Sequence, residues 1–86
     1  MLKVKEVYPQ ADYCLTIVFD TGETKLFDVK PYLEKGIFKE LKNVAYFNKV
    51  SVKLNSIAWP NEQDFSPDTL YLLGSDKLKN EQDKAA

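Results

Sequence analysis

Arginine and histidine are absent from this sequence of 86 residues, and its 12 basic residues are all lysines. Without histidine, the chain lacks the side chain that usually moves the proton of a serine or cysteine nucleophile. Without arginine, it lacks the planar donor group that reads guanine and binds phosphate in two places. Because the net charge is only -1, the sequence argues against nucleophilic enzymes and against direct nucleic-acid binding.

Cysteine occurs once, at Cys14, which excludes an internal disulfide bond and a metal site built from several cysteines. No histidine is present to lower the pKa of this thiol, so we interpret Cys14 as a structural residue. The acids Glu62, Asp64 and Asp68 suggest a hard-cation site, but loop and helix-start roles explain them more simply, and they lack the spacing of a calcium loop. We expect no metal and no cofactor.

Glycine is scarce and scattered, which excludes a glycine-rich phosphate loop. Pairs of carboxylates such as Asp12 with Asp20 or Asp28 leave acid–base chemistry open in principle, since the contacts of the fold decide it. Two acids alone are a weak indication of an active site. We therefore expect that the protein is not an enzyme.

Long apolar runs are missing as well. No stretch approaches the ~18–20 apolar residues that span a bilayer. Residues 1–5 alternate charged and apolar side chains, unlike the continuous apolar core of a signal peptide. We expect a cytoplasmic protein that does not enter a membrane.

Alternating apolar and polar residues predict three strands in the first part of the chain, at 2–8, 12–19 and 23–28. The clearest is 12–19, where one face carries Tyr13, Leu15, Ile17 and Phe19. A turn containing Gly22 joins it to the third strand. The alternation breaks near Glu6, which a bulge or a strong twist in the first strand would explain.

Helix signals appear later. Pro31 favours a first helical turn, and Ser66-Pro67-Asp68 predicts a capped helix that ends at Gly74. Between them, spacing predicts helical turns at 31–34, 37–42 and 44–48. It also predicts strands at 49–54 and 57–59, joined by a turn at Asn55-Ser56. The prediction is a small α+β fold. Its antiparallel sheet has about four or five short strands and begins as a three-stranded meander, with short helices between strands three and four and at the C-terminus.

A chain of this length forms one domain, which we place at residues 1–74. Residues 75–86 are charged, and Leu78 is their one large apolar side chain. This composition predicts a flexible C-terminal tail.

Tyrosine and tryptophan are amphipathic and suit recognition surfaces. Core packing explains Trp59 better than an interface does, whereas the two roles stay equally open for Tyr32 and Tyr46. The candidate interaction surface comprises Tyr32, Tyr46, Trp59, Asp64 and Tyr71. A strand at 2–8 or 49–54 would also offer backbone groups to a partner chain if it lay at a sheet edge.

Three stretches form a recognisable series. The first is Asp12-Tyr13-x-Leu15, followed by Phe19-Asp20-x-Gly22-Glu23 and Phe27-Asp28. The second is Pro31-Tyr32-Leu33-x-x-Gly36-x-Phe38-x-x-Leu41. The third is Phe47-x-x-Val50, followed by Trp59-Pro60-x-x-x-Asp64-Phe65-x-Pro67-Asp68-x-Leu70-Tyr71. Together they resemble the small bacterial proteins of the domain of unknown function 2442 family. The resemblance covers nearly all of residues 1–73.

The resemblance implies a compact α+β domain with no established activity and no catalytic residues to transfer. Similar proteins are often encoded beside another small family of unknown function, numbered 4160, which suggests a toxin–antitoxin-like pairing. We therefore hypothesise a non-enzymatic interaction module that binds the neighbouring gene product, with self-association also open. The alternative is a small-molecule-sensing or regulatory domain whose DNA-binding output domain is missing or lies on another chain.

Overall fold

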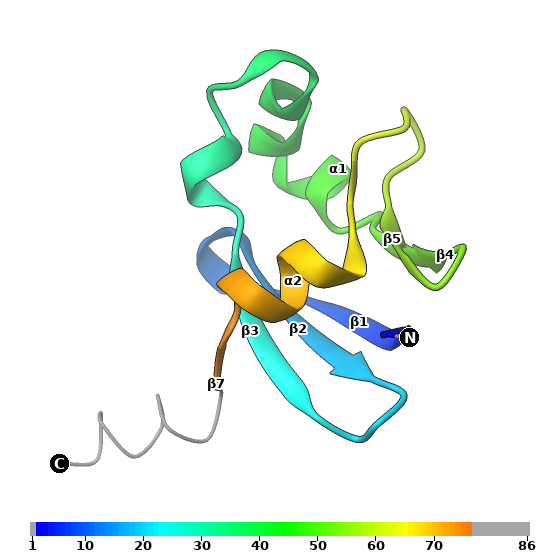
Figure 1. Ribbon diagram of the computed structural model, residues 1–86. Coiled ribbons are helices and arrows are strands. Elements are labelled where there is room, and N and C mark those ends of the chain that lie inside the picture. Colours follow the sequence, from blue (N-terminus) through cyan, green and yellow to red (C-terminus); the bar gives the residue numbers. More distant parts are fainter. Residues whose placement is uncertain (1, 77–86) are drawn as a thin grey trace, which may run out of the picture.

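The N-terminal part of the chain folds back on itself twice to form an antiparallel meander (Figure 1). The structure is a computed structural model that describes residues 2–76. Its first three strands are β1 (Val4–Gln10), β2 (Cys14–Phe19) and β3 (Thr24–Asp28). At the turn between β2 and β3, Gly22 takes a φ of +93°, which only glycine adopts readily.

The break in alternation near Glu6 corresponds to a register shift in the first strand, as the bulge interpretation expects. The register of β1 against β2 shifts between Val4 and Glu6, so that Val4 pairs with Phe19 while Val7 pairs with Ile17. One extra residue, Lys5, is thereby accommodated, and two valines three positions apart face the same side of the sheet. The break in alternation is thus the means by which both valines reach the core.

The strand predicted at 12–19 begins two residues later than expected. Asp12 and Tyr13 have φ values of +63° and +60°, in the left-handed region, and belong to a tight corner, η1 (Ala11–Tyr13). This corner reverses the chain between β1 and β2. Tyr13 still contributes to packing, since its ring meets that of Phe47 edge-on with 5.4 Å between centroids.

Three short helical segments follow β3, as the spacing predicts: η2 (Lys30–Tyr32), η3 (Gly36–Lys42) and α1 (Val44–Phe47). Pro31 lies in the first turn of η2, where its missing N–H costs no hydrogen bond. The Asn43 side chain caps α1 by accepting a hydrogen bond from the Tyr46 N–H at 3.1 Å.

A second, three-stranded antiparallel sheet comprises β4 (Ser51–Lys53), β5 (Ser56–Ala58) and β6 (Asp64–Phe65), in that order. The predicted strand at 49–54 is shortened because Leu54 lies in the turn. Leu54 and Asn55 both have positive φ and form a two-residue hairpin connection, since Lys53 pairs with Ser56. β6 was not predicted from the sequence.

The last helix is α2 (Pro67–Leu73), which lies across β2 and β3 (Figure 1). The Ser66 hydroxyl caps it by accepting from the Thr69 N–H at 3.1 Å. Gly74 ends the helix with an ordinary extended φ of -73°. Glycine is required there because a Cβ atom would lie 2.5 Å from the Leu70 carbonyl oxygen.

The chain then adds one more strand to the first sheet. β7 (Ser75–Asp76) pairs with β3, so the strand order is β1-β2-β3-β7. The sequence had assigned these two residues to the tail. The rest of the predicted tail, residues 77–86, lies outside the described residues.

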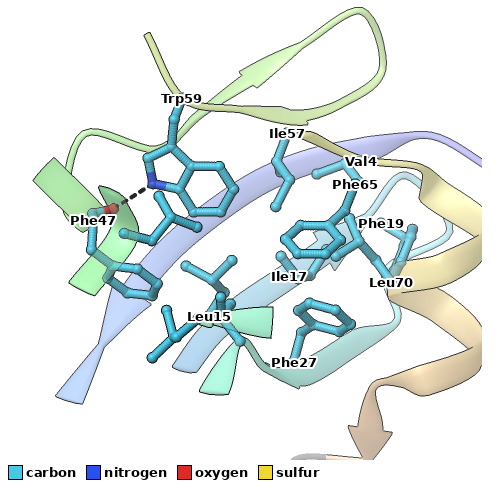
Figure 2. Packing of buried hydrophobic residues seen from close by; sticks show 13 residues of the cluster. Val4, Leu15, Ile17, Phe19, Phe27, Phe47, Ile57, Trp59, Phe65 and Leu70 are labelled. Atoms are coloured by element: carbon cyan, nitrogen blue, oxygen red, sulfur yellow. Dashed lines mark hydrogen bonds between the residues drawn. The ribbon is translucent and has the colours of Figure 1, made fainter. Parts of the chain in front are cut away.

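The core lies between the meander, α2 and the second sheet (Figure 2). Phe19, Phe27 and Phe47 are at most 1% exposed. Phe65 from β6 meets the ring of Phe27 at 4.9 Å and that of Trp59 at 6.1 Å. The expected fold class, a small α+β domain with antiparallel strands and short helices, is therefore confirmed, although the strands divide into two sheets.

Candidate functional site

Trp59, one of the five predicted surface residues, belongs to the core. It is 3% exposed. Its indole N–H points at α1 and donates a hydrogen bond of 2.8 Å to the Phe47 carbonyl oxygen (Figure 2). This bond satisfies the single polar group of the side chain, so Trp59 fastens α1 to β5 and is not a surface group.

Tyr46 is half-buried and takes part in a polar network. Its hydroxyl donates to Gln63 Oε1 at 2.7 Å and accepts from the Asn61 N–H at 2.8 Å. Gln63 is only 1% exposed, and its Nε2 donates to the Ile37 carbonyl oxygen at 2.9 Å. Because the buried amide is fully bonded, the network holds the loop after β5 in a defined position.

Glu40 completes this network from the surface. Its carboxylate accepts hydrogen bonds from Asn61 Nδ2 at 2.9 and 2.8 Å and from Gln63 Nε2 at 3.0 Å. These bonds, first those from Asn61 and then that from Gln63, hold the pKa of Glu40 below its usual range. We call Glu40, Tyr46, Asn61 and Gln63 the loop clamp.

Tyr32 packs in the aromatic cluster, where its ring meets those of Phe65 at 5.0 Å and Phe27 at 5.9 Å. Tyr71 lies elsewhere, with its hydroxyl donating to Glu23 Oε2 at 2.9 Å, a bond that raises the pKa of the tyrosine. Lys25 Nζ sits 4.7 Å above the Tyr71 ring. Neither tyrosine belongs to the open groove on the second sheet, to which Asp64 contributes.

Asp64, the fifth predicted residue, lines an open groove of about 400 Å³ on the second sheet. Strands β4, β5 and β6 and the turns that join them supply the walls. The residues around it are Lys53, Leu54, Ser56, Ile57, Ala58, Glu62, Asp64, Phe65 and Ser66. We call this feature the hairpin groove. Of the predicted surface residues, Asp64 alone contributes to it.

Register explains why the sheet is hollow at this place. Ala58 pairs with Ser51 on one side and with Asp64 on the other, so these three side chains share the outer face of the sheet. Ser56 lies two residues before Ala58 on the same strand and therefore on the same face. Ser51, Ser56 and Ala58 are short side chains, while longer ones stand at the rim. The Ser56 hydroxyl donates a hydrogen bond to the Phe65 carbonyl oxygen.

Two rim residues of the hairpin groove sit on unfavourable backbone. Leu54 has a φ of +51° and Glu62 a φ of +75°. Leu54 occupies the two-residue turn between β4 and β5, and Glu62 the last position of the turn before Gln63. Glycine or asparagine is favoured at such positions, so both large side chains carry a conformational cost of about 1 kcal/mol each.

The charges of the hairpin groove are separated. Lys53 is at one end, and Glu62 and Asp64 are at the other. None of the three forms an ion pair or side-chain hydrogen bond with another residue in the range 2–76. Lys53 and Leu54 were not predicted as site residues, and their available signal was a leucine next to the turn residue Asn55.

A second polar cluster involves Lys30. Its Nζ lies 3.1 Å from Asp12 Oδ2 and from Asp28 Oδ1, and 3.9 Å from the Cys14 sulfur. Of the predicted acid pairs, Asp12 with Asp28 is thus brought together around a lysine, and Asp20 is elsewhere. Burial raises the pKa of the Cys14 thiol in spite of the nearby ammonium group, which disfavours the reactive thiolate.

No candidate metal-binding cluster is found among the residues that the structure describes. Across residues 2–76, no three or more Cys, Asp or Glu side chains are grouped so as to hold a metal ion. Within the same range, none of the helices has the length and apolar character needed to cross a membrane.

The fold therefore defines a small α+β domain with a hairpin groove on its second sheet and a core closed by α2. A family model described as "Protein of unknown function (DUF2442)" matches residues 4–74. The chain belongs to this family, as the three sequence stretches indicate. The search of curated proteins found no match, and neither did the search of solved structures.

Proposed function

We propose that this chain is a non-catalytic protein-interaction module, one partner of a two-protein system of the toxin–antitoxin type. The observation that supports it most directly is Leu54. Its side chain is 88% exposed and stands at the tip of the β4–β5 hairpin, on backbone that leucine adopts at a cost. A large apolar side chain held in water against its backbone preference suits contact with a second protein.

The fold itself does not need a leucine at this position. The β2–β3 turn uses Gly22 where φ is positive, and the β4–β5 turn would be more stable with glycine or asparagine. Val52, two residues before Leu54, is 40% exposed, so the hairpin presents two aliphatic side chains outside the core. We infer that these side chains serve binding.

We infer the partner from the family resemblance. Proteins that resemble this chain are often encoded next to a second small family of unknown function, which favours the neighbouring gene product as the protein that covers the hairpin.

Co-expression with the neighbouring gene product tests this proposal. A tagged wild-type chain should recover the neighbour in a stable complex, and Leu54→Asp should reduce recovery at least tenfold by placing a charge in the contact. Leu72→Asp is the matched control, since Leu72 is 76% exposed but lies on α2. Failure of the wild-type chain to recover the neighbour would contradict the proposal.

A second candidate function is small-molecule sensing, and the hairpin groove favours it. Its volume of about 400 Å³ falls within the range of ligand sites. A metabolite that raises the melting temperature of the wild-type chain but not of Ala58→Leu, whose larger side chain would fill the groove, would support this function. A panel without any such shift would remove it.

A further inference from the structure

We propose that the hairpin groove holds an extended segment of the partner protein, with a cationic side chain against Glu62 and Asp64 and an aliphatic side chain against Leu54. This inference rests on the proposed interaction function and names the partner chemistry. The occupant is thus a short stretch of chain with one basic residue at one end and an aliphatic residue beside it.

The shape of the groove suits a chain segment. Its floor is the outer face of the second sheet, where Ser56 and Ala58 project little beyond the backbone. An extended segment laid on such a floor can place alternate side chains downward, toward the floor and rim. A groove open on its outer side also admits a continuing polypeptide, which an enclosed cavity would not.

Charge decides the chemistry of the occupant. Asp64 and Lys53 share the outer face but stand two strands and two residues apart, which places their Cα atoms about 12 Å from each other. No ion pair joins them within residues 2–76, so the two charges are not paired with one another. Glu62 adds a second carboxylate to the Asp64 end, so that end attracts a cation, while Lys53 repels one at the other end.

The two strained turns place the groups that do the recognition. Leu54 rises at the Lys53 end, and Glu62 rises at the Asp64 end, both on backbone with positive φ. The loop clamp fixes the second of these turns, since Asn61 and Gln63 flank Glu62 and both bond to Glu40. The carboxylate is therefore presented by a loop that is already ordered, which lowers the cost of binding.

Peptide titration into the ¹⁵N-labelled full chain, followed by NMR, tests the inference. The probes are capped pentapeptides: Lys-Ala-Leu-Ala-Ala, its counterpart with Glu in place of Lys, and Lys-Ala-Leu-Ala-Lys. The singly basic peptide should shift the amides of residues 53–58 and 62–66 and bind at least tenfold more tightly than the acidic one. It should also bind more tightly than the doubly basic peptide, because Lys53 repels the second cation.

Variants supply the controls. Glu62→Gln with Asp64→Asn should reduce the preference for the basic peptide to less than threefold, and Lys53→Glu should make the doubly basic peptide the tightest binder. Equal shifts for the basic and acidic peptides, shifts mapping away from the groove, or no shifts would overturn the inference. Self-association of the wild-type chain that is abolished in the variant Glu62→Gln with Asp64→Asn would also overturn the inference. The occupant of the groove would then be a second copy of the chain.

The experiments distinguish failure of the groove inference from failure of the proposed interaction function. If the wild-type chain recovers the neighbouring gene product and the variant Glu62→Gln with Asp64→Asn recovers it equally well, the interaction function stands and the groove is not its site. If no complex forms with the wild-type chain, the interaction function itself is wrong.

Discussion

A single leucine links local strain to the proposed function. Leu54 is exposed to solvent, lies at a φ of +51°, and borders both the hairpin tip and the hairpin groove. Selection for stability alone would favour asparagine or glycine there. The conflict between backbone preference and residue identity is the reason for assigning a binding role to this position.

Replacement of Leu54 by asparagine should therefore stabilise the protein. Asparagine tolerates the left-handed region, so Leu54→Asn should raise the free energy of unfolding by about 1 kcal/mol in urea titrations. Leu72→Asn is the matched control, a leucine that is also exposed but lies in the helix α2, and should give no gain. A loss of stability in Leu54→Asn would show that the turn is not strained as argued.

Individual side-chain roles were only partly predictable. The sequence favours a core position for Trp59, and the hydrogen bond from its indole N–H to the Phe47 carbonyl oxygen explains that position. Tyr32 and Tyr46 could not be assigned, because an amphipathic ring looks the same in sequence whether its hydroxyl meets water or a buried amide. For Tyr46 the deciding partner, Gln63, lies 17 residues away.

At the scale of the elements, the junction of α2 and β7 depends on a close approach that glycine alone permits. Where α2 meets β7, a Cβ on Gly74 would lie 2.5 Å from the Leu70 carbonyl oxygen and 3.0 Å from the Lys25 Cβ. Gly74→Ala should destabilise the protein by about 1–3 kcal/mol, measured by urea unfolding. Gly36→Ala, which meets nothing within 4 Å, should cost less in spite of its φ of +48°. The reverse order would contradict the packing described for α2.

The loop clamp should make stability depend on pH. Hydrogen bonds from Asn61 and Gln63 lower the pKa of Glu40 in the folded state, so the folded state disfavours its protonated form. The stabilisation is fully present above the unfolded pKa of about 4.3 and is lost as the pH falls through the lower folded value.

Melting temperatures of the wild-type chain and Glu40→Gln between pH 7 and pH 3 measure this effect. The wild-type curve should fall more steeply below about pH 4.3. Asn61→Ala keeps the carboxylate and removes its first partner, so its curve should also be flatter than the wild-type curve. Parallel curves for all three proteins would rule out the clamp as a source of acid sensitivity.

Long alternating segments were predictable, and short ones were not. Period-two patterning located β1, β2 and β3 to within two residues at each end, and the corner at Asp12 and Tyr13 accounts for the late start of β2. β6 and β7 have two residues each, too few to show a period. The turn predicted at Asn55-Ser56 lies one residue earlier, at Leu54 and Asn55, because leucine is a poor turn residue and was assigned to the strand.

At the scale of the whole molecule, composition and patterning sufficed for the fold class, and the resemblance of three sequence stretches indicated the family. The hairpin groove was beyond such reasoning, because its rim joins residues from two separate turns whose alignment depends on the registers of three strands. Asp64 was singled out from its place in a loop, but its neighbours Lys53 and Leu54 emerge only when the second sheet is assembled.

The central claim is that the β4–β5 hairpin of this chain binds the neighbouring gene product. Isothermal titration calorimetry of the two purified proteins tests it most directly, with Leu54→Asp as the variant and Leu72→Asp as the control. We predict saturable binding by the wild-type chain and the control, and at least tenfold weaker binding by Leu54→Asp. No heat of binding with the wild-type chain, or equal affinity for Leu54→Asp, would contradict the claim.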